Sequence, residues 1–211
     1  MIKNLRIGIS TRIVKNERFD ENRDIISHDW INFFEQLNFI PILIPNTLNN
    51  VSFFLDKMNL DGVILSGGDN MGDFPERDKT ESEIIKFSIQ ENIPLFGVCR
   101  GMQVINNFFN GTIQNNVTSK HVRKNHKILF LKNNFCNLNI DTIEVNSFHE
   151  NLINKYDLGD NLESLAIAPV DDTIEAISHK KYKILAVMWH PERKFDENSK
   201  NILKYFFDSG D

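Results

Sequence analysis

Cys99 lies at the predicted junction of a strand and a helix, where a cysteine can serve as a nucleophile. Residues 93–98 form a short apolar run that predicts a buried strand, and residues 99–109 carry apolar side chains at helical spacing. Gly97 and Gly101 flank the cysteine, as in the cysteine form of a G-x-S-x-G nucleophile elbow, where a Cβ at either position would crowd the turn. A helix N-terminus favours the thiolate. The sequence therefore predicts a reactive thiol rather than an inert buried cysteine.

A cysteine nucleophile needs a base, and a candidate lies near the other end of the chain. Residues 184–189 form a second apolar run that predicts a strand, and His190, Pro191 and Glu192 follow it. Pro191 favours an extended backbone at His190, and side chains two apart in an extended segment share a face. We therefore expect Glu192 to hold the imidazole in the tautomer that accepts the thiol proton. A His-x-Glu pair alone is commonly just a pair of charged surface residues. Its position at a strand end, opposite a cysteine elbow, favours a catalytic role.

These motifs resemble those of a known family. Gly97-Val98-Cys99-Arg100-Gly101-Met102-Gln103 and Trp189-His190-Pro191-Glu192 resemble the class I glutamine amidotransferases, and Cys-Arg-Gly-Met-Gln most closely resembles the gamma-glutamyl hydrolase branch, the peptidase C26-like group. The similarity extends over nearly the whole chain. It includes residues 6–10, 39–45, 61–69, 107–112, 145–149 and 170–177.

The resemblance implies a role for each matching residue. Cys99 would attack the gamma-carbonyl of a glutamine-like group, His190 would take its proton and later protonate the leaving amine, and Glu192 would orient His190. The backbone N–H groups of Gly68 and Arg100 would form an oxyanion hole, the usual stabiliser of a tetrahedral intermediate. The alternative for Gly67-Gly68 is a plain turn.

The resemblance also implies contacts with the alpha-amino and alpha-carboxylate groups of the glutamyl substrate. The residues implied are Gln103, Asn146, Ser147, Phe148 and His149. A solvent-facing side chain is the alternative for Gln103, and a structural role is the alternative for His149.

The chain departs from the family's pattern around the mouth of the predicted site. Glu150 follows the Asn-Ser-x-His run where relatives often carry a second His and a Gln, and Asp171-Asp172 replaces the usual Asp-Gly turn. The loop over residues 69–77 is shorter than usual. These departures leave the predicted triad intact but weaken any transfer of substrate from relatives.

Strands and helices alternate along the predicted chain. The predicted strands are 6–10, 40–44, 62–65, 93–98, 127–131, 143–146, 162–168, 174–178 and 184–188. The predicted helices are 23–37, 51–58, 80–90, 99–109 and 197–207. The alternation indicates an α/β fold with three layers, a mostly parallel, flavodoxin-like sheet with helices on both faces. Residues 1–211 are expected to form a single hydrolase domain.

Composition excludes several classes of protein. The net charge of -5 leaves no electrostatic footprint for nucleic acid, and no apolar run is long enough to span a membrane. The predicted strand that begins at Arg6 leaves no room for a signal peptide, and a reactive Cys99 with only Cys136 as a second cysteine suits the reducing cytoplasm. No Cys/His cluster has zinc spacing and no glycine-rich phosphate motif occurs, so neither a metal nor a cofactor is expected.

Three functions remain open. The first is a free-standing hydrolase that cleaves a gamma-glutamyl amide through a thioester on Cys99 and releases L-glutamate. The second is a glutaminase subunit that delivers ammonia to a separate synthetase. The third is a non-catalytic binding protein on the same scaffold, whose signature would be a lost triad member. The Cys-Arg-Gly-Met-Gln motif favours the first.

The sequence leaves the identity of the leaving group open. Gamma-glutamyl-GABA, other gamma-glutamyl amines and folate polyglutamates occur as substrates in the wider family. The chain also resembles the gamma-glutamyl-CDP-amidate hydrolases of bacterial capsule phosphoramidate biosynthesis, which implies cytidine diphosphoramidate as a product. A phosphate-bearing substrate would need positively charged side chains at the mouth of the site, and guanidinium groups suit phosphate geometry. The alternative for each candidate is an ordinary charged surface residue. The candidates are Arg12, Lys15, Arg18, Arg23, Arg77 and Arg193.

Overall fold

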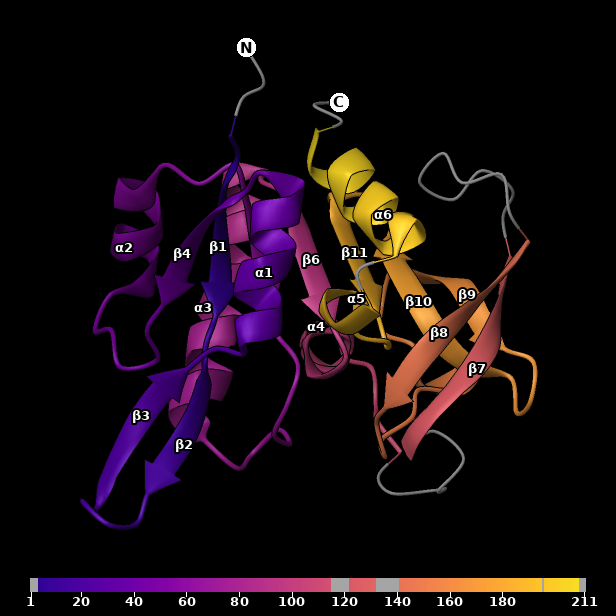
Figure 1. The fold of residues 1–211 in the computed structure, drawn as a ribbon, viewed down its shortest axis with the longest axis horizontal. Coiled ribbons are helices and arrows are strands. Elements are labelled where there is room, and N and C mark those ends of the chain that lie inside the picture. Colours follow the sequence, from indigo (N-terminus) through magenta and orange to yellow (C-terminus); the bar gives the residue numbers. More distant parts are fainter. Residues whose placement is uncertain (1–3, 115–121, 132–140, 195, 209–211) are drawn as a thin grey trace.

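A large twisted sheet crosses the whole molecule in the computed structural model (Figure 1). The structure describes residues 4–114, 122–131, 141–194 and 196–208. Within them, a nine-stranded sheet has the order β4-β1-β5-β6-β11-β10-β9-β7-β8. In that order the strands are Ile40–Ile44, Arg6–Ser10, Gly62–Leu65, Leu95–Val98, Ile184–Val187, Thr173–His179, Leu162–Ala168, Val122–Phe130 and Thr142–Phe148.

The sheet has a parallel half and an antiparallel half. Strands β4, β1, β5, β6 and β11 are parallel to one another, whereas β10, β9, β7 and β8 extend the sheet from β11 through antiparallel pairs. Parallel strands place the loops that follow them at one edge of a sheet, which is where ligands bind in open α/β folds. The loops after β5 and β6 therefore lie side by side.

Helices cover both faces of the sheet. The helices are α1 (His28–Leu37), α2 (Val51–Met58), α3 (Pro75–Glu91), α4 (Arg100–Phe108), α5 (Pro191–Lys194) and α6 (Glu197–Asp208). Apolar side chains of α1 and α6 join one core cluster, and those of α2, α3 and α4 join the other. These two cores, one on each face, confirm the predicted three-layer α/β fold.

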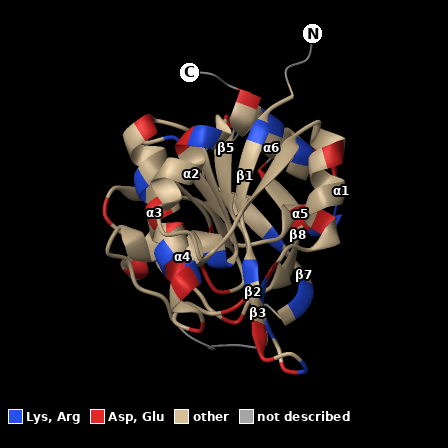
Figure 2. Cartoon of the chain, turned by 90° about the vertical axis from the view of Figure 1, so that its left-hand side faces the viewer, with Lys and Arg blue, Asp and Glu red and all other residues tan. Residues whose placement is uncertain are grey.

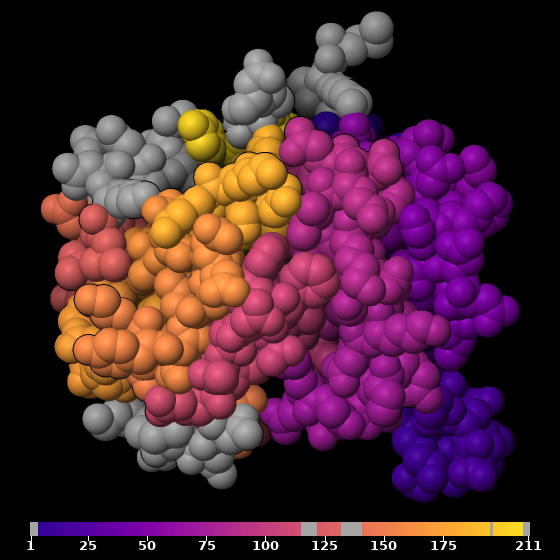
Figure 3. Space-filling model, turned by 180° about the vertical axis from the view of Figure 1, so that it is seen from behind, coloured from indigo at the N-terminus to yellow at the C-terminus, as the bar shows by residue number. Residues whose placement is uncertain are grey.

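Several predicted bounds are wrong. The predicted helix 23–37 begins only at His28, because Ser27 caps it by accepting the Asp29 N–H at 3.2 Å. The residues before it form a hairpin of β2 (Arg12–Asn16) and β3 (Glu21–Ile25), which projects from the body in Figure 3. Every residue of β3 is exposed, so the hairpin has no alternating apolar pattern to reveal it.

Helix α3 begins at Pro75, five residues before the predicted start of the helix over 80–90. Its first turns bury charged side chains, Arg77 and Glu81, so the apolar period that marks an amphipathic helix is absent there. Smaller differences affect the strands: β6 is shorter than predicted, whereas β7 and β8 are longer.

The outer surface carries charges of both signs. Figure 2 shows Lys and Arg interspersed with Asp and Glu over the outer helices and the β2–β3 hairpin. None of the helices in the described residues combines the length and the apolar character needed to cross a membrane. Cys136 lies outside the described residues, in the segment 132–140 that follows the strand predicted at 127–131.

Glycines let α4 approach the sheet closely beside Cys99. A Cβ on Gly97 would lie 2.7 Å from Cδ1 of Ile105 and 3.0 Å from Cβ of Ala186, and a Cβ on Gly101 would overlap the backbone carbonyl of Leu65. The glycines that flank Cys99 in the sequence are therefore needed for packing, as the elbow motif predicts.

Candidate active site

Cys99 links β6 to α4 through a strained turn. Its backbone has φ 51° and ψ -104°, its N–H donates to the Val187 carbonyl at 2.8 Å, and its own carbonyl accepts the N–H groups of Met102 and Gln103. A positive φ is rare for a side chain with a Cβ and is typical of functional sites, and a sharp turn from strand to helix defines the nucleophile elbow. The structure therefore confirms the elbow geometry around Cys99.

His190 and Glu192 lie in direct contact. The imidazole Nδ1 is 2.7 Å from Oε1 of Glu192, and each residue is only 3% exposed. The predicted extended segment does not continue to Glu192, however, because Pro191 begins the short helix α5 and Glu192 lies in its first turn. Proline is favoured at a first helical position, since the N–H that it lacks would have no partner there.

The Asn146 amide holds the backbone of His190. Its Nδ2 donates to the His190 carbonyl at 2.7 Å, and its Oδ1 accepts the His190 N–H at 2.9 Å. The ring of Phe148 meets the imidazole edge-on, with the two ring centroids 5.8 Å apart. Strand β8 thus fixes His190 from the antiparallel half of the sheet.

Cys99 and His190 form a coupled acid–base pair. Burial raises the pKa of the Cys99 thiol, but its hydrogen bond with His190 and the nearby His190 and His149 charges outweigh burial and lower that pKa. Burial likewise lowers the pKa of His190, but the hydrogen bonds to Cys99 and Glu192 raise it to about 9. Both directions favour a thiolate beside an imidazolium near neutral pH, which is the reactive form of a cysteine nucleophile.

A cavity of about 210 Å³ opens at Cys99. It brings together much of the predicted site from separate elements. The predicted residues that line it are Gly68, Cys99, Arg100, Gln103, Phe148 and His149.

Gly68 and Arg100 each offer a backbone N–H beside this cavity. Gly68 has φ 86°, and Arg100 is the first residue of α4, where helical N–H groups have no partner within the helix. In the part of the chain that the structure describes, neither N–H donates a hydrogen bond. Both donors are therefore available to an anion that forms on a group attacked by Cys99.

The other predicted substrate contacts differ in position. Gln103 is buried rather than solvent-facing, and its Oε1 accepts from Nδ2 of Asn151 at 3.4 Å. Ser147 is fully buried and, like Asn146, is not among the residues that line the cavity. A contact of Asn146 or Ser147 with substrate therefore remains only a prediction.

His149 is held from behind by a buried carboxylate that sequence reasoning missed. Its Nε2 lies 3.6 Å from Oε1 of Glu175, and its Nδ1 lies 3.1 Å from the carbonyl of Asn151. Glu175 is fully buried in β10 and also lies 3.5 Å from Nε2 of His126. Burial lowers the pKa of His149, but the interaction with Glu175, together with the nearby Cys99 and the Asn151 carbonyl, outweighs burial and raises that pKa. A carboxylate between Ile174 and Ala176 in a predicted strand is the signal that could have marked Glu175.

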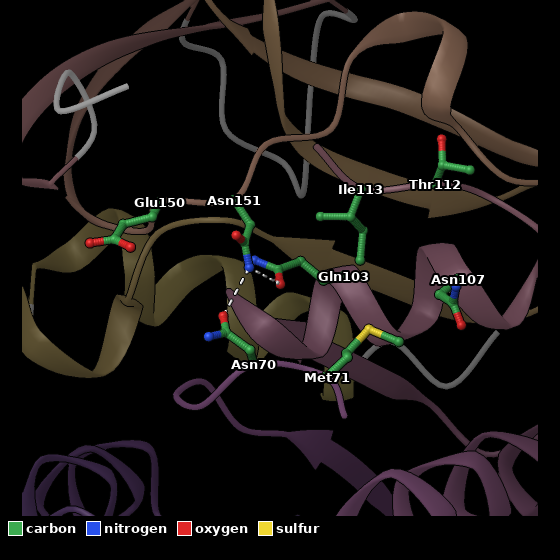
Figure 4. Close-up of a pocket in the computed structure, with 8 residues that line it drawn as sticks. All are labelled: Asn70, Met71, Gln103, Asn107, Thr112, Ile113, Glu150 and Asn151. Carbon is green, nitrogen blue, oxygen red and sulfur yellow. Dashed lines mark hydrogen bonds between the residues drawn. The ribbon is translucent and has the colours of Figure 1, made fainter. Parts of the chain in front are cut away.

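A second cavity of about 610 Å³ adjoins the first. The two share Asn70, Gln103, Glu150 and Asn151 in their linings. Figure 4 shows Asn151 between Gln103 and Asn70, and its Nδ2 donates to Oδ1 of Asn70 at 3.1 Å. Glu150, one of the departures from the family's pattern, thus lies at the junction of the two cavities.

The six candidate phosphate-binding cations are not brought together. Arg77 is fully buried and bonded to protein groups, which corrects its candidacy. Lys15, Arg18 and Arg23 lie on the projecting β2–β3 hairpin. Only Arg12 and Arg193 line a narrow space together with Gly68 and His190.

The described residues hold no group of three or more His, Cys, Asp or Glu side chains arranged to bind a metal ion.

Comparison with known proteins identifies the family. The sequence profile described as Peptidase C26 matches residues 6–192. The chain belongs to the peptidase C26 family. Peptidase C26 is part of the class I glutamine amidotransferase group, and the chain is a hydrolase that acts on a carbon–nitrogen amide bond of the gamma-glutamyl type.

Relatives of this peptidase C26 member extend over most of its length. It is 35% identical to gamma-glutamyl-CDP-amidate hydrolase from Campylobacter jejuni over 210 residues, which cover 95% of this chain and 96% of that protein. It is 31% identical to anthranilate synthase component 2 from Cyanophora paradoxa, with 88% and 95% covered. A glutamine amidotransferase structure from Thermotoga maritima superposes with a TM-score of 0.71 at 16% identity, covering 98% of this chain and 100% of that one, which shows the shared fold.

Replacing His190 tests the acid–base pair. Because His190 supplies the leading interaction that lowers the Cys99 pKa, the His190→Gln variant should have a raised thiol pKa. The thiolate is the species that iodoacetamide alkylates, so the pH at which alkylation of the Cys99 peptide is half-maximal should move upward. Mass spectrometry of that peptide separates it from Cys136.

The control is His179→Gln, which changes another buried histidine, one that packs between the rings of Phe109 and Tyr182. It should leave the alkylation profile of Cys99 unchanged. An unchanged profile in His190→Gln would contradict the coupled pair.

Proposed function

We propose that this chain hydrolyses the gamma-glutamyl amide bond of gamma-glutamyl-CDP-amidate to L-glutamate and cytidine diphosphoramidate. The observation that carries the reaction type is the buried contact of Cys99, His190 and Glu192 beside the free N–H groups of Gly68 and Arg100. The substrate is supported by the identity of 35% over 96% of the Campylobacter jejuni hydrolase, a protein of nearly the same extent.

The reaction proceeds in two steps. The Cys99 thiolate attacks the gamma-carbonyl, and the N–H groups of Gly68 and Arg100 stabilise the oxyanion. His190 then donates its proton to the leaving nitrogen as the carbon–nitrogen bond breaks, which leaves a glutamyl thioester on Cys99. Water, deprotonated by His190, attacks the thioester, releases glutamate and restores the thiol. Glu192 keeps the imidazole oriented and stabilises its charged form.

The two sides of Cys99 suit the two parts of the substrate. The glutamyl group fits the cavity of about 210 Å³, which Gln103, Phe148 and His149 line, and the raised pKa of His149 favours its positively charged form. The leaving nitrogen must lie next to His190, which protonates it. Arg193 lies on that side, with its guanidinium 4.3 Å above the Phe148 ring, and its side chain is 38% exposed. We propose that Arg193 binds the substrate phosphates there.

The cellular setting follows from this chemistry as part of the proposal. Residues 1–211 act as one hydrolase domain in the cytoplasm, where the thiol stays reduced. The phosphoramidate product would supply the biosynthesis of capsule polysaccharide.

A glutaminase subunit is the second candidate. The similarity to anthranilate synthase component 2 favours it, because that name describes one component of a synthase. In that case the chain would hydrolyse glutamine and deliver ammonia to a partner synthetase. A non-catalytic binding protein is disfavoured, since all three triad side chains are present and His190 contacts both others.

Glutamate release by the purified protein, measured without partners, tests this function. The substrates are gamma-glutamyl-CDP-amidate, gamma-glutamyl-GABA, a folate diglutamate and L-glutamine. We expect fast release from the CDP-amidate and little from glutamine. Cys99→Ala should reduce the rate by at least about a thousandfold. Release from glutamine alone, or only after a synthetase is added, would favour the glutaminase subunit instead.

Arg193→Gln tests the phosphate contact. Loss of a hydrogen-bonded guanidinium should raise KM for gamma-glutamyl-CDP-amidate about tenfold and leave KM for a substrate without phosphates nearly unchanged. Arg18→Gln is the matched control, because Arg18 also lies over a phenylalanine ring, 5.2 Å from the centroid of Phe19, but on the projecting hairpin. Equal KM changes for both kinds of substrate would remove Arg193 from phosphate recognition.

A further inference from the structure

Arg77 is a guanidinium with no exposed surface at all. A buried charge is costly unless it is paired and hydrogen-bonded, so the partners of Arg77 show what its burial achieves. Its Nη1 donates to the Gly68 carbonyl at 2.8 Å, and its Nη2 donates to the carbonyls of Ser66 at 2.9 Å and Gly67 at 3.1 Å. One side chain therefore binds three consecutive carbonyls of the loop that follows β5.

These bonds determine which way the loop presents its N–H groups. The Gly67 carbonyl and the Gly68 N–H belong to one peptide unit, and in a planar trans peptide the two point in opposite directions. With the carbonyl bound to Arg77, the Gly68 N–H points away from Arg77. Gly68 lines the cavity at Cys99, and its positive φ shows that the loop's conformation is one that most residues avoid.

Glu81 connects the same loop to the other N–H donor. Its Oε1 accepts from Nε of Arg77 at 3.0 Å and from the Ser10 hydroxyl at 2.9 Å. Its Oε2 pairs with the guanidinium of Arg100, which also pairs with Asp78. One fully buried carboxylate on α3 thus holds both the loop that carries Gly68 and the first residue of α4.

We infer that Arg77 and Glu81 are positioning residues, which hold the backbone N–H groups of Gly68 and Arg100 in the arrangement that an oxyanion requires. The inference rests on the proposed acyl transfer at Cys99. Arg77 and Glu81 touch no reacting atom and act only through the backbone that they orient. This role also explains why α3 buries charged side chains near its N-terminus instead of apolar ones.

Steady-state kinetics of Arg77→Gln and Arg77→Lys test the inference. Loss of one oxyanion donor lowers kcat by about a hundredfold to a thousandfold in enzymes of this type, with little effect on ground-state binding. We expect a fall of that size in Arg77→Gln, with KM within about threefold of wild type. Arg77→Lys should recover part of kcat, because an ammonium keeps the charge but lacks the planar fork that reaches several carbonyls.

The rate at which iodoacetamide alkylates Cys99 distinguishes this role from damage to the catalytic pair. The rate should stay at the wild-type value in both Arg77 variants, since Arg77 does not contact Cys99 or His190. Arg6→Gln is the matched control. The Arg6 Nε donates to the Met58 carbonyl at 2.9 Å far from the site, so this variant should change thermal stability without changing kcat.

Several outcomes overturn the inference. Folded Arg77 variants that retain wild-type kcat would do so, as would a fall in kcat matched by an equal fall in the alkylation rate. If Arg77→Gln does not fold, kcat and the alkylation rate are measured instead in Arg77→Lys and in Glu81→Gln, which is an isosteric change. Failure of the proposed function looks different: wild-type protein would then release no glutamate from any gamma-glutamyl substrate in a Cys99-dependent manner.

Discussion

The hydrogen-bonded pair of Cys99 and His190 is the interaction on which the site depends. Both groups are buried, and burial alone favours their neutral forms, but each lies beside the other and beside further groups that shift its pKa toward the charged form. Glu192 stabilises the imidazolium from one side, and the Asn146 amide fixes the backbone of His190 from another. His149, which lies 3.6 Å from Glu175, also contributes to the lowered pKa of Cys99.

The division of the sheet explains how these groups meet. The parallel half supplies the elbow and the Gly67–Gly68 loop, because the carboxyl ends of β5 and β6 lie next to each other. The antiparallel half supplies Asn146, Phe148 and His149 from β8 and the loop after it, and Glu175 from β10. Strand β11 joins the halves, since it pairs in parallel with β6 and antiparallel with β10, and it leads directly toward His190.

Local patterns in the sequence predicted the parts of this site that depend on local geometry. The elbow followed from glycines beside Cys99, and the partnership of His190 with Glu192 followed from their spacing, although Pro191 begins a helix rather than an extended segment. The roles of Arg77 and Glu81 could not be predicted, because they depend on how α3 packs against the loop after β5 and against α4. The position of Glu175 within a strand is visible in the sequence, but its partners His126 and His149 lie elsewhere in the chain. The exposed β2–β3 hairpin was missed for the opposite reason: its side chains contribute no apolar pattern.

The central claim is that a glutamyl group is transferred to Cys99 before water attacks. The most direct test adds hydroxylamine during turnover and measures the ratio of gamma-glutamyl hydroxamate to glutamate from two substrates with different leaving groups. A common thioester predicts the same ratio from both substrates, with both products lost in Cys99→Ala. A ratio that depends on the leaving group, or turnover that continues in Cys99→Ala, would contradict a shared glutamyl intermediate on this cysteine.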